Sequence, residues 1–191
     1  MAGLFQVFFW ITQDNRVSLI ETSFEKVESL SYSPFEGYDK KVLSPEQIEE
    51  DVSMLSHFTS KVRTYSTADA KVILEATSKT DLPVDLGIWI SGDHKENHLE
   101  IQRALKLLEK YPDNIANVIV GNETLLRADL NEDELFAYID FVAEFTNKPI
   151  TCAETWDVWE RIPDLAKHVD FITIHILPYW EKVPIDRFND F

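Results

Sequence analysis

The sequence is poor in cysteine and glycine, and each shortage excludes a class of site. Cys152 is the only cysteine among 191 residues, so neither an internal disulfide nor a cysteine cluster for zinc can form. The five glycines do not make a glycine-rich loop for nucleotide phosphates. His94 and His98 lie four residues apart, but the glutamate between them is not placed as in the H-E-x-x-H metal motif, which favours a solvated helix start. We therefore expect no metal and no cofactor.

Basic residues are also scarce. Lys and Arg number 18 against 34 Asp and Glu, which gives a net charge of −16 and would repel a phosphate backbone. We therefore expect no nucleic acid partner. Aromatic residues, by contrast, make up 12% of the chain, and flat aromatic rings suit the apolar faces of sugars as well as protein cores.

Six short and mostly apolar runs have the composition of strands that are buried on both faces. They are residues 27–33, 61–66, 84–90, 116–122, 149–154 and 171–176. Their centres recur about every 30 residues, the length of a strand with its crossover helix, which predicts right-handed connections and a parallel sheet. No linker or low-complexity segment interrupts them, so the pattern indicates one continuous α/β domain.

Helix starts can be recognised between these runs. Ser44 with Gln47 three residues later predicts a capping box, and Asn131 with Glu134 repeats the pattern. Thr67 is a candidate cap for a further helix. Apolar stripes predict two more helices, over residues 99–111 and 156–167.

Polar and aromatic residues follow the predicted strands. Functional groups of parallel α/β proteins gather at the carboxyl ends of strands, so these residues are the candidates for a site. In chain order they are Tyr32, Arg63, Tyr65, Trp89, Asn122, Glu123, Glu154, His175, Tyr179, Trp180 and Glu181.

The strand-end motifs together resemble glycoside hydrolase family 17, the β-1,3-glucanase-like enzymes, and most closely its bacterial branch. The motifs are SYSPF, VRTYS, LGIWI, IVGNETLLR, TCAETWDVW and HILPYWE, in the family's order and at similar spacing from Val27 to Val183. The resemblance implies a (β/α)8 TIM barrel that acts on β-1,3-glucan. Such a barrel usually needs about 250 residues, and about six of its βα units can be counted here.

The resemblance implies that the pair Asn122-Glu123 supplies the general acid, with Glu123 as proton donor and Asn122 bonded to the sugar 2-hydroxyl. A retaining glycosidase also needs a second carboxylate about 5 Å away to attack the anomeric carbon. Hydrolysis and transfer to another sugar share these two groups. Taken alone, Glu123 would be interpreted as a first-turn acid stabilised by a helix dipole.

The family's nucleophile lies in a Gly-Glu-Thr/Ser-Gly-Trp-Pro-like segment that this sequence does not contain. The resemblance makes Glu154 and Glu181 subsite or supporting residues, and the alternative for both is a solvated loop carboxylate. It assigns the sugar cleft to Tyr32, Arg63, Tyr65, Trp89, Tyr179 and Trp180, although core packing explains each aromatic equally well. The competing hypothesis is a catalytically incomplete fragment, or a module that binds glucan without cleaving it.

The apolar run from Leu4 to Ile11 is too short to cross a bilayer, which takes about 20 residues. Bacterial relatives often carry a membrane helix before the first strand, so residues 1–26 resemble the end of an anchor, with the domain of residues 27–191 outside the cytoplasm. The alternative is a segment that plugs the bottom of the barrel. A sheet that lacks two units would also have an open edge at which a second chain could pair.

Overall fold

The protein forms a curved parallel sheet that makes up part of a (β/α) barrel, as the sequence predicts. The computed structural model describes residues 26–36 and 41–182. In this part of the chain six strands pair in the order β1-β4-β5-β6-β7-β8, and every pair is parallel. The strands are Leu30–Ser31 (β1), Val62–Arg63 (β4), Val84–Ile88 (β5), Ile115–Asn122 (β6), Ile150–Thr155 (β7) and Thr173–His175 (β8). Each lies within or overlaps a predicted run.

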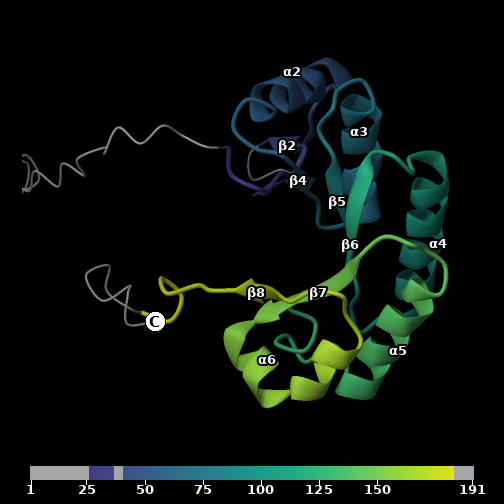
Figure 1. The fold of residues 1–191 in the computed structure, drawn as a ribbon, viewed down its shortest axis with the longest axis vertical. Coiled ribbons are helices and arrows are strands. Elements are labelled where there is room, and N and C mark those ends of the chain that lie inside the picture. Colours follow the sequence, from purple (N-terminus) through teal and green to yellow (C-terminus); the bar gives the residue numbers. More distant parts are fainter. Residues whose placement is uncertain (1–25, 37–40, 183–191) are drawn as a thin grey trace, which may run out of the picture.

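Helices cover the outer, convex side of this sheet, and the two edge strands lie at the open side (Figure 1). The helices are Pro45–Leu55 (α2), Thr67–Thr77 (α3), His94–Lys110 (α4), Glu132–Ala143 (α5), Trp156–Arg161 (α6) and the 3-10 helix Pro163–Lys167 (η1). Because each helix follows its strand along the chain, all strands end at the same rim of the curved sheet.

The helix boundaries follow local capping chemistry. Both predicted capping boxes are present, at Ser44 before α2 and at Asn131 before α5. The cap of α3 is Ser66 rather than Thr67, because the Ser66 hydroxyl accepts the Asp69 N–H while Thr67 already has helical geometry. The predicted helix over residues 156–167 is split into α6 and η1, because Pro163 cannot continue an α-helix.

Two further features depart from the sequence prediction. A small antiparallel pair, Phe35–Glu36 (β2) with Lys41–Val42 (β3), follows β1, and its two-residue strands carry no readable periodicity. Helix α4 begins at His94, because the Asp93 carboxylate accepts the N–H groups of Lys95 and Glu96, and it joins the predicted solvated helix start over residues 94–98 and the predicted helix over residues 99–111 into one helix.

The faces of the sheet differ in character. Leu86 and Ile88 point to the helices and are at most 1% exposed. Asp85 alternates with them and points to the inner side, where its carboxylate accepts bonds from Asn117 Nδ2 (2.7 Å) and Ser29 Oγ (2.9 Å). The apolar core therefore lies between sheet and helices, and polar groups line the inside of the curve.

The expected N-terminal extension, residues 1–26, falls almost entirely outside the described residues. Its role as an anchor or a barrel plug stays a prediction. Among the residues that the structure describes, no helix has the length and apolar character needed to span a bilayer.

Candidate active site

Four side chains from three strands meet at the carboxyl rim of the sheet. Arg63 ends β4, Asn122 ends β6 and is followed by Glu123, and His175 ends β8. Arg63 Nη2 donates to Asn122 Oδ1 at 2.8 Å, and Arg63 Nη1 lies 3.2 Å from His175 Nε2. His175 Nδ1 lies 2.6 Å from Glu123 Oε1. All four residues were candidates from the sequence, although His175 was given no role, and the structure brings them into one network.

The network fixes the tautomer of His175. A guanidinium can only donate, so His175 Nε2 must accept the bond from Arg63, which leaves the ring proton on Nδ1. That Nδ1–H then donates to Glu123 Oε1. Because Oε1 serves as the acceptor, Oε2 of Glu123 is the oxygen that is left for a proton to be transferred.

Arg63 also orients its other neighbours. Its guanidinium carbon lies 5.1 Å from the centre of the Tyr65 ring, two residues further along the chain. Burial lowers the pKa of Arg63, while Tyr65, Asp85 and Glu123 act in the opposite direction. Since Asn122 Oδ1 accepts from Arg63, the amide nitrogen Nδ2 is the end of Asn122 that is left for a ligand.

The backbone under Glu123 is unusual. Glu123 has φ +55°, a left-handed conformation that costs a residue other than glycine on the order of 1–3 kcal/mol. Gly121, two residues earlier, has φ +84°, and a Cβ there would lie 2.7 Å from Thr124 Oγ1. The Glu123 N–H donates to the Ala153 carbonyl at 2.7 Å, which ties the acid to the neighbouring strand β7. The conformation of this turn and its bond to β7 therefore fix the direction in which the Glu123 side chain leaves the backbone.

Trp89 forms an aromatic wall beside this network and is 39% exposed. The Arg127 guanidinium carbon lies 4.5 Å from the centre of its ring. Arg127 also donates to the carbonyls of Asn122 and Ile90 and pairs with Asp129. It therefore joins the end of β5 to the end of β6.

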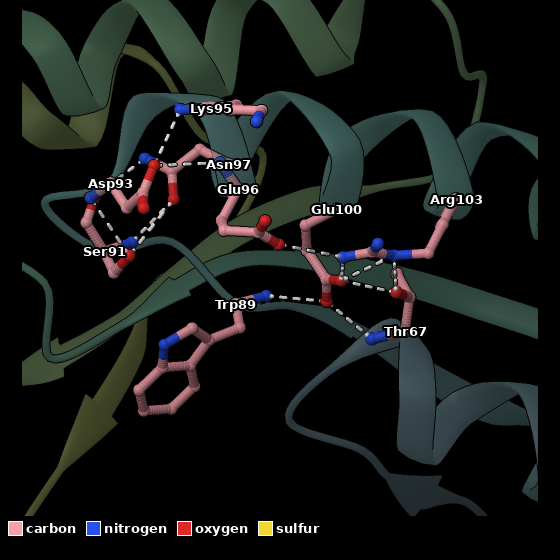
Figure 2. Close-up of polar contacts among 9 residues, drawn as sticks. All are labelled: Thr67, Trp89, Ser91, Asp93, Lys95, Glu96, Asn97, Glu100 and Arg103. Atoms are coloured by element: carbon pink, nitrogen blue, oxygen red, sulfur yellow. Dashed lines mark hydrogen bonds and ion pairs between the residues drawn. The ribbon is translucent and has the colours of Figure 1, made fainter.

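The backbone of Trp89 is fixed from behind by helix α4. Figure 2 shows the Glu100 carboxylate between the Trp89 N–H, Thr67 and Arg103, with the indole of Trp89 pointing away from the helix. Asn97, 1% exposed, accepts the Ser91 N–H and donates to the Ser91 carbonyl. The predicted solvated helix start thus has a buried inner side that shapes the loop after β5.

An exposed aromatic group lies beyond β7 and β8. Tyr179 and Trp180 are 81% and 74% exposed and pack edge to face with ring centres 5.2 Å apart. Trp156 Nε1 donates to Glu181 Oε1 at 3.0 Å. Flat, exposed rings beside a carboxylate suit the binding of sugar rings by stacking and hydrogen bonding.

Two predicted site residues point elsewhere. Tyr32 directly follows β1 and points to the helix side of the sheet, where its hydroxyl donates to Asp51 of α2 at 2.7 Å. Burial and the Asp51 carboxylate raise its pKa. Glu154 is 1% exposed, so it is no solvated loop carboxylate, and both of its oxygens accept backbone N–H groups. Neither side chain takes part in the network of Arg63, Asn122, Glu123 and His175.

Three residues of the site received no role from the sequence. His175 was recognised only as a strand end, Arg127 only as the last letter of IVGNETLLR, and Trp156 only as part of TCAETWDVW. Their contacts join residues from different strands, which a motif read along the chain does not reveal. The resemblance of each motif to the family was the only signal available.

The two histidines of α4 each contact a different side chain. His94 Nδ1 contacts the Tyr138 hydroxyl at 2.9 Å, and His98 Nε2 contacts Gln102 Nε2 at 2.9 Å. Within residues 26–36 and 41–182 no group of three or more His, Cys, Asp or Glu side chains is arranged to hold a metal ion.

Comparison with known proteins identifies the fold and the family. Residues 29–191 match the family model described as the BtgE/BtgC glycoside hydrolase domain. A relative from Aspergillus flavus, "Probable glucan endo-1,3-beta-glucosidase btgC", is 30% identical over 156 residues, which cover 73% of this chain and 22% of that protein.

Two solved structures share the fold. The glycoside hydrolase family 17 β-1,3-glucanosyltransferase from Rhizomucor miehei superposes with a TM-score of 0.74 at 25% identity, over 86% of this chain and 62% of that one. An endo-laminarinase from Formosa superposes with a TM-score of 0.72 at 19% identity, over 82% and 52%. The chain thus spans part of the length of these proteins. The predicted resemblance to family 17 is confirmed, and the chain belongs to the BtgE/BtgC glycoside hydrolase domain family.

Proposed function

We propose that this chain carries the proton-donating side of an active site for β-1,3-glucan, used for hydrolysis with retention or for transfer of the glucosyl unit to another sugar. Glu123 is the general acid. The observation that carries this proposal is the bond between His175 Nδ1 and Glu123 Oε1, at 2.6 Å, in a network that Arg63 orients.

The chemistry follows from this arrangement. Oε2 of Glu123 donates its proton to the glycosidic oxygen as the bond from that oxygen to the anomeric carbon breaks, while a second carboxylate, which retention requires in addition to Glu123, bonds to that carbon. In the second step the Glu123 carboxylate takes a proton from water, for hydrolysis, or from a sugar hydroxyl, for transfer, and the oxygen of that water or hydroxyl displaces the second carboxylate from the anomeric carbon. Asn122 Nδ2 donates to the sugar 2-hydroxyl, a contact that strengthens as positive charge develops on the ring.

The sugar-binding wall consists of side chains around this acid. Arg63 and Glu181 supply hydrogen bonds, and the aromatic rings supply stacking surfaces; these rings are Tyr65, Trp89, Tyr179 and Trp180. The names of similar proteins support the substrate class: they include glucan endo-1,3-β-glucosidases, and a Rhizomucor miehei β-1,3-glucanosyltransferase variant was solved with laminaritriose.

The second candidate function is binding of β-1,3-glucan without cleavage. It is favoured by the geometry of the two carboxylates at this rim that could stand in for a nucleophile, Glu154 and Glu181. Glu154 is the first carboxylate that could replace the family's nucleophile. It is buried and both of its oxygens accept N–H groups, so its geometry does not suit attack on an anomeric carbon. Glu181, the other, is exposed and accepts a bond from Trp156.

Both candidates can be tested with one set of variants. The parent chain, Glu123→Gln and the surface control Glu109→Gln are incubated with soluble β-1,3-glucan, and products are separated by chromatography. Hydrolysis or transfer predicts products from the parent and the control, with a rate about 100-fold or more lower in Glu123→Gln. Binding alone predicts no products and equal affinity-gel retardation for parent and control. If the parent chain gives no products and shows no retardation, both functions are contradicted.

The open edge bears on assembly. Strand β8 is an edge strand among the described residues, and Ile174 and Ile176 are 45% and 57% exposed. An edge with apolar side chains pairs readily with another strand, and we propose that β8 pairs with a second copy of this chain. Size-exclusion chromatography with light scattering tests it, and a monomer at all concentrations would contradict it.

A further inference from the structure

Glu154 is a buried carboxylate that the proposed chemistry does not use. It lies at the end of β7, is 1% exposed, and belongs to the helix-side face that it shares with the fully buried Cys152. Its Oε1 accepts the N–H of Leu125 at 2.8 Å, and its Oε2 accepts the N–H of Leu126 at 3.4 Å. A carboxylate rarely stays buried unless partners occupy it, so these bonds account for its location.

The two N–H groups belong to the turn that carries Glu123. The turn closes with bonds from the Arg127 N–H to the Glu123 carbonyl (2.9 Å) and from the Ala128 N–H to the Leu125 carbonyl (3.1 Å). N–H groups at the start of such a turn have no partner within it. Glu154 supplies that partner from the neighbouring strand.

Adjacent residues of β7 thus contact both ends of one short segment. The Ala153 carbonyl accepts the Glu123 N–H, and the Glu154 carboxylate accepts the next free N–H groups. Between them Glu123 has a left-handed φ of +55°. A strained conformation persists only where its surroundings over-determine it, and these bonds are the ones that do so here.

We propose that Glu154 is a positioning residue for the general acid: its carboxylate fixes the backbone at Leu125 and Leu126, and through that turn it directs Glu123 toward His175. The inference rests on the proposed role of Glu123. It replaces the expectation that Glu154 contacts sugar, and it predicts that loss of the carboxylate disturbs the acid without removing any atom from the cleft.

The groups around Glu154 act on it in opposite directions. Burial raises the pKa of Glu154, its bonds to the Leu125 and Leu126 N–H groups and the charge of Arg127 lower it, and the charge of Glu123 raises it. The guanidinium of Arg127 is itself bonded to the carbonyls of Asn122 and Ile90. Turn, carboxylate and guanidinium therefore form one unit behind the acid.

The test compares Glu154→Gln with Asp170→Asn. The glutamine keeps one acceptor oxygen but presents an NH2 group to a backbone N–H, so one of the two bonds is lost. Asp170 is the matched control, because its carboxylate accepts the Ile150 N–H at 2.8 Å at the opposite end of the same strand. If Glu154→Gln does not fold, Glu154→Asp, which keeps the charge on a shorter side chain, takes its place.

The main readout is the His175 imidazole in 1H–15N NMR spectra, since its Nδ1–H reports the bond to Glu123 without any need for activity. In Glu154→Gln we expect this proton to shift upfield and exchange faster with water, and the Leu125 and Leu126 amides to exchange about tenfold faster. Asp170→Asn should leave all three signals unchanged. An unaltered His175 signal in a folded Glu154 variant would overturn the proposal.

The sugar-binding assays of the proposed function separate the two ideas. If the parent chain neither binds nor cleaves glucan but the His175 signal still depends on Glu154, the proposed function fails while the positioning contact stands. If glucan is bound or cleaved but the His175 signal is the same in the Glu154 variant, the proposed function stands and the positioning role of Glu154 fails.

Discussion

His175 Nδ1 lies 2.6 Å from Glu123 Oε1, although 52 residues separate the two along the chain. The contact crosses from the segment after β6 to β8, over the end of β7, which lies between these strands in the sheet. It makes His175 the partner that decides which oxygen of Glu123 is free.

Replacement of His175 tests this relationship. We expect His175→Ala to lower the rate of β-1,3-glucan turnover by about 10- to 100-fold, because a misdirected catalytic group is penalised by that order. His175→Asn, whose amide nitrogen occupies nearly the place of Nδ1, should retain more of the rate. Equal rates for the alanine variant and the parent would refute the role of His175.

Replacement of Arg63 by lysine is expected to destabilise the protein. Its guanidinium contacts both Asn122 and His175, and a single ammonium cannot reproduce this fork. Arg63→Lys should lower the free energy of unfolding by about 1.5–3 kcal/mol, the range for hydrogen bonds to charged groups. Urea unfolding measures the change. Arg161→Lys, on a surface pair with Asp157, is the control and should change it by less than about 0.5 kcal/mol.

The sequence carries the order of elements but only part of the site. Strand runs and capping boxes are local signals, so the six parallel strands and the starts of α2 and α5 were predictable. The alternation Leu30-Ser31-Tyr32-Ser33 also indicates that Tyr32 shares the helix-side face with Leu30, a signal that the motif resemblance overrode. Its hydroxyl accordingly bonds to α2.

Glu154 could not be assigned from the sequence for a different reason. A glutamate at a strand end is compatible with a cleft, a loop or a buried turn, and only the path of the segment after β6 decides. The same holds for His175 and Arg127, whose partners lie on other strands. Contacts across strands depend on sheet curvature and register, which no single motif encodes.

The stability of the protein should decrease as the pH rises through the range in which Glu154 loses its proton. Burial raises the pKa of Glu154 to about 7 from an ordinary value of 4.5, against the effect of its backbone bonds. The folded protein therefore binds this proton more tightly than the unfolded chain. The contribution of Glu154 is greatest below pH 4.5 and is lost between pH 4.5 and 7, by a total on the order of 3 kcal/mol.

Urea unfolding at pH 5 and pH 7.5 measures this loss. Other groups also titrate over this range, so the informative quantity is the difference between the parent and Glu154→Gln, which has no proton to lose. The parent should lose more stability than the variant between the two pH values. Identical pH dependence for both proteins would contradict a raised pKa at Glu154.

Glu100 should be the most sensitive carboxylate outside the acid network. It accepts the Thr67 N–H at 2.6 Å, the Thr67 hydroxyl at 2.5 Å and the Trp89 N–H at 3.4 Å, and it pairs with Arg103 at 3.0 Å (Figure 2). Glu100→Gln removes the charge while keeping the shape. Because Thr67 and Trp89 belong to different units of the barrel, we expect a loss of about 2–3 kcal/mol in the free energy of unfolding.

The matched control is Glu96→Gln, one turn earlier on the same helix, whose exposed carboxylate lies 3.9 Å from the same Arg103. It should cost less than about 0.5 kcal/mol, as surface changes do. Release of the Trp89 backbone should also move the indole, so Glu100→Gln is expected to weaken the affinity for β-1,3-gluco-oligosaccharides severalfold in titration calorimetry. If the two variants unfold at the same urea concentration, Glu100 does not fix the rim, and the orientation of Trp89 depends instead on its contact with Arg127.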